Sequence, residues 1–254
     1  MISLFGEPVS VHGIKIYPVT MKNYMQFMTF IPILKVKKNR IPDREVIGMT
    51  YLDFLIKYLP DHPEGFVIGP IDMLVLVLAL CLDENVIKNM EITTEDINGA
   101  IVLRINQEDA PPILIDGNKF EDIRKNILEV NGIEDADYTL SEEVERALEN
   151  ARMEQAKMST SNPPTLEDMV DLYHVLTGMS YENISNMQIR KFFNNMKKIM
   201  MIEDYKICKT AEMSGMVTFK KSIPHWFRHQ DASQPYSDVK TNLNEFEQKT
   251  REFN

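Results

Sequence analysis

The sequence has few of the residues that build recognisable catalytic or nucleotide-binding motifs. It contains 10 glycines and 2 cysteines in 254 residues, and no glycine falls in a GxGxxG or GxxxxGKS array. Loops that cradle dinucleotides or nucleoside triphosphates are therefore not predicted. No serine or cysteine sits in a nucleophile elbow. Cys81 and Cys208 lie within apolar helical patterns, where a free cysteine behaves as a small hydrophobic residue, so we expect a reducing compartment.

Patterns for metal binding and membrane insertion are also missing. His225 and His229 are four residues apart, but no glutamate follows the first histidine and no third ligand is evident. We therefore predict no metal and no cofactor. The most apolar window, residues 71–82, is 12 residues long, whereas a helix needs about 20 residues to span a bilayer. No basic segment precedes an apolar run near Met1, so no signal peptide is predicted.

Positive charge is the scarcer sign. The chain has 28 Lys and Arg against 38 Asp and Glu, a formal net charge of −10. That balance disfavours nucleic acid and anionic membranes as partners, because both need clustered cations. Methionine, by contrast, is abundant, with 17 residues. Flexible Met side chains suit adaptable protein-binding surfaces, although codon bias in an AT-rich genome is an equal alternative.

The apolar spacing predicts an α+β fold that is mostly helical. Alternating residues around His12 and Gly13 predict an N-terminal β-hairpin. Residues 101–105 and 113–115 predict a small central two-stranded element. Helical spacing predicts four helices in this half, over residues 20–34, 43–59, 70–82 and 118–131, with Thr20, Asp43 and Asn118 as N-caps and Gly132 as the last stop.

Composition divides the chain into three parts. An acidic, weakly apolar helix over residues 141–154 is followed by residues 158–164, which are polar and contain two prolines. We therefore predict an N-terminal α+β domain over residues 1–157 and a helical subdomain over residues 165–229. Residues 230–254 form a polar tail, which holds one loose amphipathic helix or orders only on binding.

The C-terminal subdomain carries the clearest local signals. Thr165 and Asp168 fit a capping box, and Gly178 ends that helix. The residues expected on its buried side are Leu166, Met169, Val170, Tyr173, Val175 and Leu176. Ser180 starts a short turn of helix before a long helix over residues 188–213, and a clipped strand ends at Trp226. The long helix has a wide apolar face and a basic face. We predict that partners bind at Phe192, Met196, Met200, Lys197, Lys198 and Trp226.

A helix-turn-helix DNA reader is the alternative for residues 165–208. The basic long helix would then enter the major groove. Against this, the preceding helix carries Glu167, Asp168 and Asp171, and the long helix is too apolar to present a base-contacting face. A nucleic-acid-binding regulator is therefore the weaker hypothesis.

Several segments together resemble a known group of phage proteins. They are FEDIRKNILEVNG (residues 120–132), TLEDMVDLYHVLTGMS (165–180), EMSG (212–215) and IPHW (223–226), with YPVTM (17–21) at the start. The chain is similar to tail-morphogenesis proteins of long-tailed bacteriophages, the tail assembly chaperones and baseplate-hub assembly proteins. The resemblance spans most of the chain and consists of short packing and capping motifs.

The resemblance implies a non-enzymatic protein that acts in the host cytoplasm during tail assembly. Its expected partners are other tail proteins, either the tape measure protein or the baseplate hub, in a homo- or hetero-oligomer. A virion component of the baseplate or neck is the alternative within the same class. No residue role carries over, because the family has no catalytic motif to match.

Overall fold

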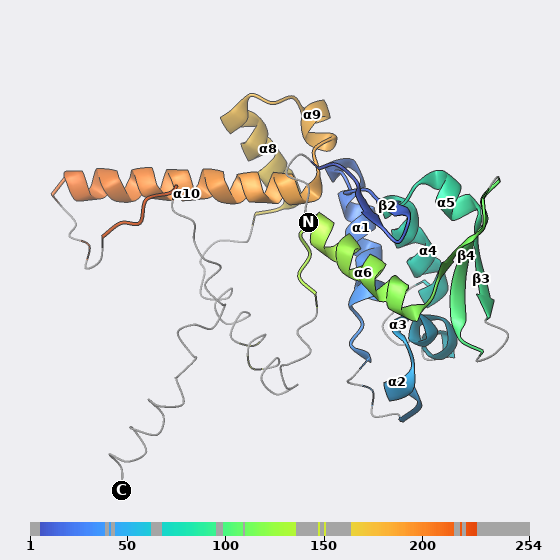
Figure 1. The fold of residues 1–254 in the computed structure, drawn as a ribbon. Coiled ribbons are helices and arrows are strands. Elements are labelled where there is room, and N and C mark those ends of the chain that lie inside the picture. The colour runs from blue at the N-terminus through green and yellow to red at the C-terminus, as the bar shows by residue number, and fades with distance from the viewer. Residues whose placement is uncertain are drawn as a thin grey trace, which may run out of the picture. The chain divides into compact units, whose positions relative to one another are not determined.

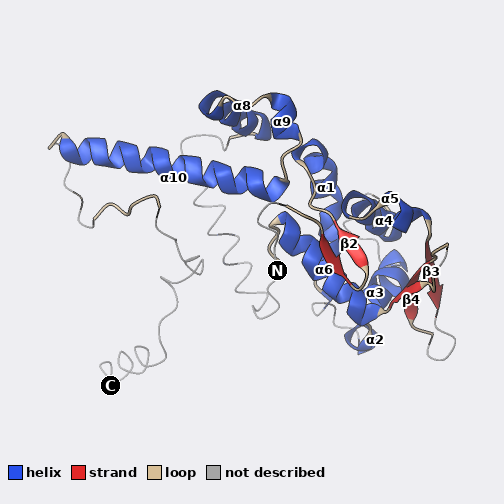
Figure 2. Ribbon diagram, turned by 45° about the horizontal axis from the view of Figure 1, so that its top comes forward, coloured by secondary structure: helices blue, strands red, loops and turns tan. Residues whose placement is uncertain are grey.

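The computed structural model describes residues 6–38, 41, 44–61, 68–94, 99–108, 110–135, 147, 150, 164–215, 219 and 222–227. The chain forms two compact units, Met1–Met196 and Lys197–Asn254. Helices dominate, and the strands make two small antiparallel sheets (Figures 1 and 2), which confirms the α+β class. The predicted boundary at 158–164, the acidic helix over 141–154 and the tail over 230–254 fall almost entirely outside the described residues. They stay predictions.

The first unit begins with the predicted hairpin. Strand β1 (Val9–Val11) pairs antiparallel with β2 (Ile14–Ile16), so that Val11 lies opposite Ile14. The two turn residues, His12 and Gly13, have φ angles of 50° and 83°. A two-residue turn with both φ angles positive matches the right-handed twist of the strands. The predicted two-residue turn is confirmed.

The next predicted helix is interrupted. A short 3₁₀ turn, η1 (Met21–Asn23), precedes α1 (Tyr24–Phe30), and a second 3₁₀ turn, η2 (Ile31–Lys35), follows it. Pro32 lies in η2 and has no N–H to continue the α-helical bonding pattern. Thr20 takes the extended N-cap conformation, but its side chain makes no capping hydrogen bond. The expected Thr20 cap is therefore wrong.

The prediction of a single helix over residues 43–59 is also wrong. Helix α2 (Arg44–Gly48) ends, and Thr50 caps a new helix, α3 (Tyr51–Asp53). The Thr50 hydroxyl accepts the Asp53 N–H at 3.1 Å and donates to Asp53 Oδ2 at 2.7 Å. Such local side-chain bonds give the backbone an alternative to continuous helix. A π-helical turn, η4 (Phe54–Tyr58), and a 3₁₀ turn, η5 (Leu59–Asp61), continue the chain; Asp43, the predicted cap, lies outside the described residues.

Asp53 links this helix to the sheet. Its Oδ1 accepts the Ile101 N–H at 3.0 Å and lies 2.9 Å from Lys57 Nζ. Burial by itself raises the pKa of this carboxyl. The hydrogen bonds from Thr50, Lys57 and Ile101 outweigh that effect, so the pKa of Asp53 lies below its ordinary value.

Asp53→Asn is expected to lower the free energy of unfolding by about 1–2 kcal/mol at pH 7. Because the folded-state pKa is depressed, the stabilisation is present above the unfolded pKa near 3.8 and disappears as pH falls through the folded value. Urea titrations at pH 7 and below pH 4 measure this. The difference in free energy of unfolding between wild type and Asp53→Asn should shrink in acid. Glu91→Gln, on an exposed residue, is the control. An equal gap at both pH values contradicts the role of the Asp53 charge.

The centre of the unit contains a three-stranded sheet and a helix that is buried on one side, with Asp72, Leu76 and Ala79 exposed on the other. Helix α4 (Pro70–Cys81) begins at Pro70, as predicted, and is followed by α5 (Glu84–Lys88), which was not predicted. Strands β3 (Met90–Thr94), β4 (Ile101–Ile105) and β5 (Ile113–Ile115) pair antiparallel in that order. The predicted two-stranded element therefore lacked the edge strand β3, whose residues show no alternating burial. No described helix is both long and apolar enough to cross a membrane.

Helix α6 (Gly117–Asn131) packs against the hairpin, α3 and β5. Asp116, rather than the predicted Asn118, is its N-cap, because the Asp116 carboxylate accepts the N–H groups of Asn118 and Lys119. Gly132 ends the helix in the left-handed conformation at φ 71°, as predicted.

Arg124 occupies the buried side of α6. Its guanidinium donates to Glu121 at 2.8 and 2.9 Å, to Asp135 at 2.6 and 2.8 Å, and to the Leu34 carbonyl at 2.7 Å. Burial favours the neutral form, but these carboxylates outweigh it, so the pKa of Arg124 is raised and the side chain stays charged. Arg124 therefore joins η2, α6 and the residues after α6.

From residue 164 to residue 215, where the structure describes every residue, the helices are α8 (Leu166–Thr177), α9 (Tyr181–Ser185) and α10 (Ile189–Met213). The signals predicted at their ends are confirmed. Thr165 and Asp168 form the capping box, Gly178 ends α8 in the left-handed conformation, and Ser180 caps α9. Gly215, just beyond α10, has a φ of 72°. Helix α10 begins in the first unit and ends in the second.

Backbone hydrogen bonds tie the junction of α9 and α10 to the chain after the hairpin. The Met21 N–H donates to the Met187 carbonyl at 2.8 Å, and the Ile189 N–H donates to the Val19 carbonyl at 3.0 Å. The Val19 N–H in turn donates to Asn131 Oδ1 at 2.8 Å, at the end of α6. These bonds fix the position from which α8 and α9 are presented.

Candidate partner-binding surfaces

Helix α8 is anchored on the first turns of α10 through one buried side chain. Tyr173 is 4% exposed, and its ring lies 5.3 Å from the Phe192 ring. The Asn195 side-chain amide donates to the Tyr173 hydroxyl at 3.1 Å. The other apolar residues of α8 are half-buried or exposed. The prediction that Val175 and Leu176 face inward is therefore wrong.

Part of the remaining surface of α8 is exposed and apolar. Leu172, Val175 and Leu176 have 44%, 74% and 47% of their surface exposed. Residues three and four positions apart lie on the same side of a helix, so the three side chains form one patch. We call it the α8 face.

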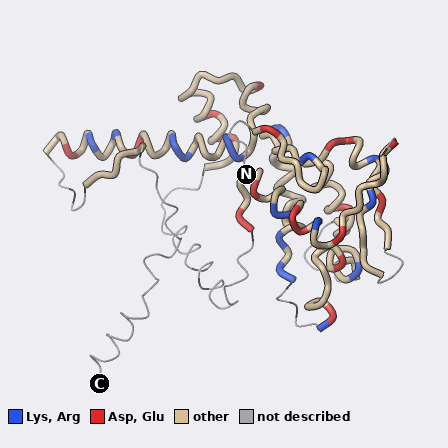
Figure 3. Tube along the Cα trace, in the orientation of Figure 1, with Lys and Arg blue, Asp and Glu red and all other residues tan. Residues whose placement is uncertain are grey.

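Acidic residues border the α8 face. From Pro164 to Met187 the chain has no Lys or Arg, and its four carboxylates, on Glu167, Asp168, Asp171 and Glu182, are all exposed. Figure 3 shows this charge along α8 and α9. Because this segment contains no Lys or Arg of its own, the hairpin of α8 and α9 has a net charge of −4.

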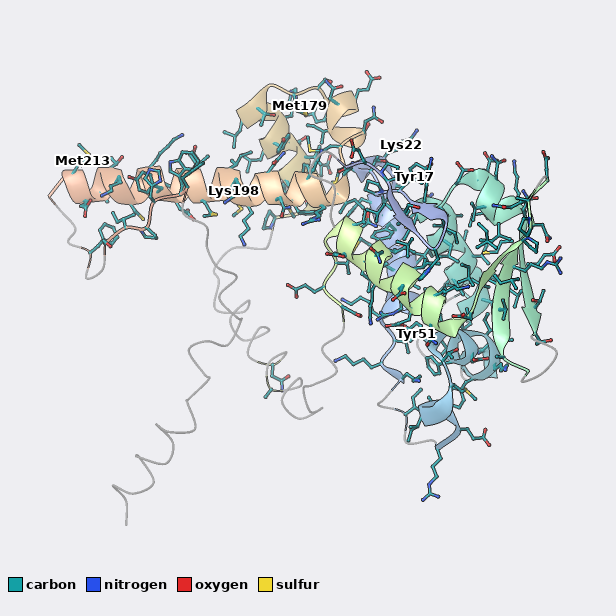
Figure 4. The ribbon with its side chains drawn as sticks, in the orientation of Figure 1. Tyr17, Lys22, Tyr51, Met179, Lys198 and Met213 are labelled. Carbon is teal, nitrogen blue, oxygen red and sulfur yellow. The ribbon has the colours of Figure 1, made fainter. Side chains whose placement is uncertain are left out.

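Aromatic contacts hold α9 beside the α8 face. The Tyr181 ring stacks on His174 with centroids 4.4 Å apart, and its hydroxyl donates to Asp171 Oδ1 at 3.0 Å. The His174 imidazole nitrogen Nδ1 lies 2.7 Å from the carbonyl of Met179, in the turn labelled in Figure 4. The edge of the α8 face is thus fixed by specific contacts.

A signal for the α8 face was present in the sequence. Each residue turns an α-helix by about 100°, so Val175 lies about 200° around the axis from Tyr173. Apolar residues on opposite sides of a helix cannot all pack against one neighbour. The prediction places Val175 on the same buried side as Tyr173, and this angle shows that one side of the helix cannot hold both.

Of the predicted partner-binding residues on α10, two are buried and three are exposed. Phe192 and Met196 belong to the core of the first unit, at 0% and 4% exposure. A docked partner cannot reach them, so we correct the prediction for these two. Met200 is 57% exposed, and Lys197 and Lys198 are exposed as well, the latter labelled in Figure 4.

Trp226 belongs to an aromatic cluster in the second unit. Its ring lies 5.4 Å from His225 and 5.5 Å from Phe227, and His225 lies 5.0 Å from Tyr205 on α10. Residues 222–225 are irregular and Trp226 and Phe227 form a turn, so the clipped strand predicted here is wrong. The segment and α10 enclose a hollow of about 180 Å³, lined by Met201, Asp204, Tyr205, Cys208, Ile223, Pro224, His225 and Trp226.

The hollow beside Trp226 suits a side chain better than a ligand. Clefts for drug-sized ligands occupy about 300–1,000 Å³, more than this hollow offers. No group of three His, Cys, Asp or Glu side chains among the described residues could hold a metal ion. Phe227, which is 78% exposed, extends the apolar surface beyond the hollow.

The two cysteines should differ sharply in reactivity. Cys81 is fully buried, and burial raises the pKa of its thiol to about 12, so almost no reactive thiolate forms at pH 8. Cys208 is only partly buried and lines the hollow with Trp226. We expect a thiol reagent to label Cys208 in the native protein and Cys81 only after denaturation.

Trp226→Ala uncovers the hollow and should raise the labelling rate of Cys208 about threefold or more. The labelling rate is measured from the absorbance released by a chromogenic disulfide reagent. Phe227→Ala, on the neighbouring residue, is the control. An unchanged rate in Trp226→Ala would show that the tryptophan does not cover α10.

The basic side of α10 is partly neutralised in the second unit. Lys206 Nζ lies 2.7 Å from Glu203, and Lys209 Nζ lies 2.7 Å from Glu212. Cations held in such pairs are less available to phosphates. The geometry therefore gives no support to a DNA-reading helix.

Comparison with protein families associates the C-terminal part of the chain with phage proteins. The family model described as the YomV second domain matches residues 155–231, less than a third of the chain, and this range includes α8, α9, α10 and Trp226. YomV comes from a Bacillus phage region, so the match associates this part of the chain with phage proteins, without specifying tail morphogenesis. No curated protein and no solved structure matches the chain.

Proposed function

We propose that the protein is a non-enzymatic tail assembly chaperone, which binds the tape measure protein or another tail protein in the host cytoplasm. One observation carries the proposal. More than half of the large apolar side chains exposed in the described chain lie within the phage-associated segment, residues 155–231. They are Leu172, Val175, Leu176, Tyr181, Met200, Ile207, Met213, Phe219 and Phe227. Three of them, Leu172, Val175 and Leu176, form the α8 face, and contiguous exposed apolar surface is typical of protein-binding sites.

A chaperone of this kind needs an apolar surface for its client and a charge that keeps the complex soluble. The exposed side chains above supply the first, and the net charge of −10 supplies the second. Neither requirement involves catalysis.

Co-expression with the tape measure protein of the same phage tests the proposal. We expect the tape measure protein to co-purify with the tagged chain, and failure to recover it or any other tail protein contradicts the proposal. Purified particles then separate a chaperone from a baseplate or neck component. Absence from particles is expected for a chaperone, whereas stoichiometric presence contradicts that assignment. A DNA shift assay at low salt should show no binding.

A further inference from the structure

We propose that the α8 face is the docking site for a basic amphipathic helix of a partner protein. This inference rests on the proposed function and specifies the chemistry of the client segment. Leu172, Val175 and Leu176 follow the spacing of one helix face, and Tyr181 adds an aromatic edge that is 52% exposed. A helix lying along this patch would cover it with side chains at the i, i+3, i+4 and i+7 positions.

The acidic residues around the α8 face favour a partner helix that carries positive charge. All four charged residues from Pro164 to Met187 are acidic and exposed. On the helical wheel, Asp168 and Asp171 lie seven and four residues before Val175, on the same side of α8. A helix with Lys or Arg flanking its apolar stripe would place cations beside these carboxylates. An acidic helix would meet repulsion, because like charges at an interface are unfavourable.

The geometry of the face is already fixed in the free protein. The Thr165 and Asp168 capping box begins α8, Gly178 ends it, and Tyr173 anchors it on Phe192. The Tyr181 hydroxyl bond to Asp171 holds α9 in place. Binding to such a preformed surface costs little ordering of the protein, so an isolated helical peptide is an adequate probe.

The test uses two synthetic 18-residue peptides that share one leucine stripe. At the positions that flank the stripe, one peptide has lysine and the other has glutamate. We expect the lysine peptide to bind the full chain at least tenfold more tightly by fluorescence anisotropy, with affinity that falls as salt rises. Equal affinity for the two peptides, or no binding of either, overturns the proposal.

Variants assign the binding to the α8 face. Val175→Glu should weaken the lysine peptide at least tenfold despite adding a negative charge, because it removes the centre of the apolar patch. Ile47→Glu is the matched control, since Ile47 on α2 is 69% exposed against 74% for Val175. Asp171→Asn keeps an acceptor for Tyr181 and should weaken binding about threefold while reducing its salt dependence. An equal loss of affinity for the lysine peptide in Val175→Glu and Ile47→Glu would overturn the assignment. A dimer of the free chain that Val175→Glu abolishes would also overturn it, because a second copy would then occupy the α8 face.

Val175→Glu also distinguishes this inference from the proposed function. If the tape measure protein co-purifies with Val175→Glu as well as with wild type, the α8 face is not the client site, although the chaperone function stands. If the lysine peptide binds as expected and no tail protein co-purifies, the docking site stands and the chaperone function fails.

Discussion

Arg124→Ala is expected to lower the free energy of unfolding by about 3–5 kcal/mol. The variant removes the donors that satisfy the Leu34 carbonyl and pair with Glu121 and Asp135, and it leaves a cavity where the guanidinium lay. The Tyr51 ring, 4.8 Å from the guanidinium carbon, also loses its cation contact. Urea denaturation followed by circular dichroism measures the loss.

Arg124→Lys separates charge from geometry. Lysine keeps the positive charge but cannot donate to two carboxylates and a carbonyl from one planar group, so we expect an intermediate loss. Lys125→Ala, on the neighbouring residue with its side chain 58% exposed, should change stability by less than about 0.5 kcal/mol. A loss below about 1 kcal/mol in Arg124→Ala would show that the buried network does not hold the first unit together.

Phe192→Ala is expected to cost about 3–5 kcal/mol of stability, the usual range for a fully buried aromatic residue. The Phe192 ring lies 5.3 Å from both Tyr173 and Phe193, so its loss loosens the attachment of α8 to α10. The sequence had suggested that Phe192 contacts a partner directly. The structure instead predicts an effect on folding, with partner binding affected only through the α8 face.

Met200→Ala is the matched control for Phe192→Ala. Met200 lies on the same helix and is 57% exposed, so its truncation should leave the free energy of unfolding within about 0.5 kcal/mol of wild type. Thermal and urea denaturation of the two variants make the comparison. If Phe192→Ala is as stable as Met200→Ala, the packing of α8 on α10 is not as the structure shows.

Features set by a few neighbouring residues were predictable from the sequence. Three kinds of feature depend on local backbone chemistry, and the structure confirms them. They are the Thr165 capping box, the helix ends at Gly132 and Gly178, and the turn at His12 and Gly13. Asp116 shows the limit of such rules. Both Asp116 and Asn118 are good caps, and only the hydrogen bonds show which one begins α6.

Features that depend on distant contacts were not predictable in the same way. Arg124 reaches the Leu34 carbonyl, 90 residues away, and no local pattern identifies that partner. Strand β3 is a partly exposed edge strand, and its pairing with β4 across residues 95–100 is a contact outside its own five residues. The burial of Phe192 and the exposure of Val175 likewise follow from which side of each helix meets the core.

The solubility of the tape measure protein tests the central claim most directly. The measurement is the fraction of that protein remaining in the supernatant after expression alone, with the wild-type chain, and with Val175→Glu. We expect a low soluble fraction for the tape measure protein alone and a several-fold higher fraction with the wild-type chain, accompanied by a complex of the two proteins on size-exclusion chromatography. The same soluble fraction with and without the wild-type chain, and no complex, would contradict it.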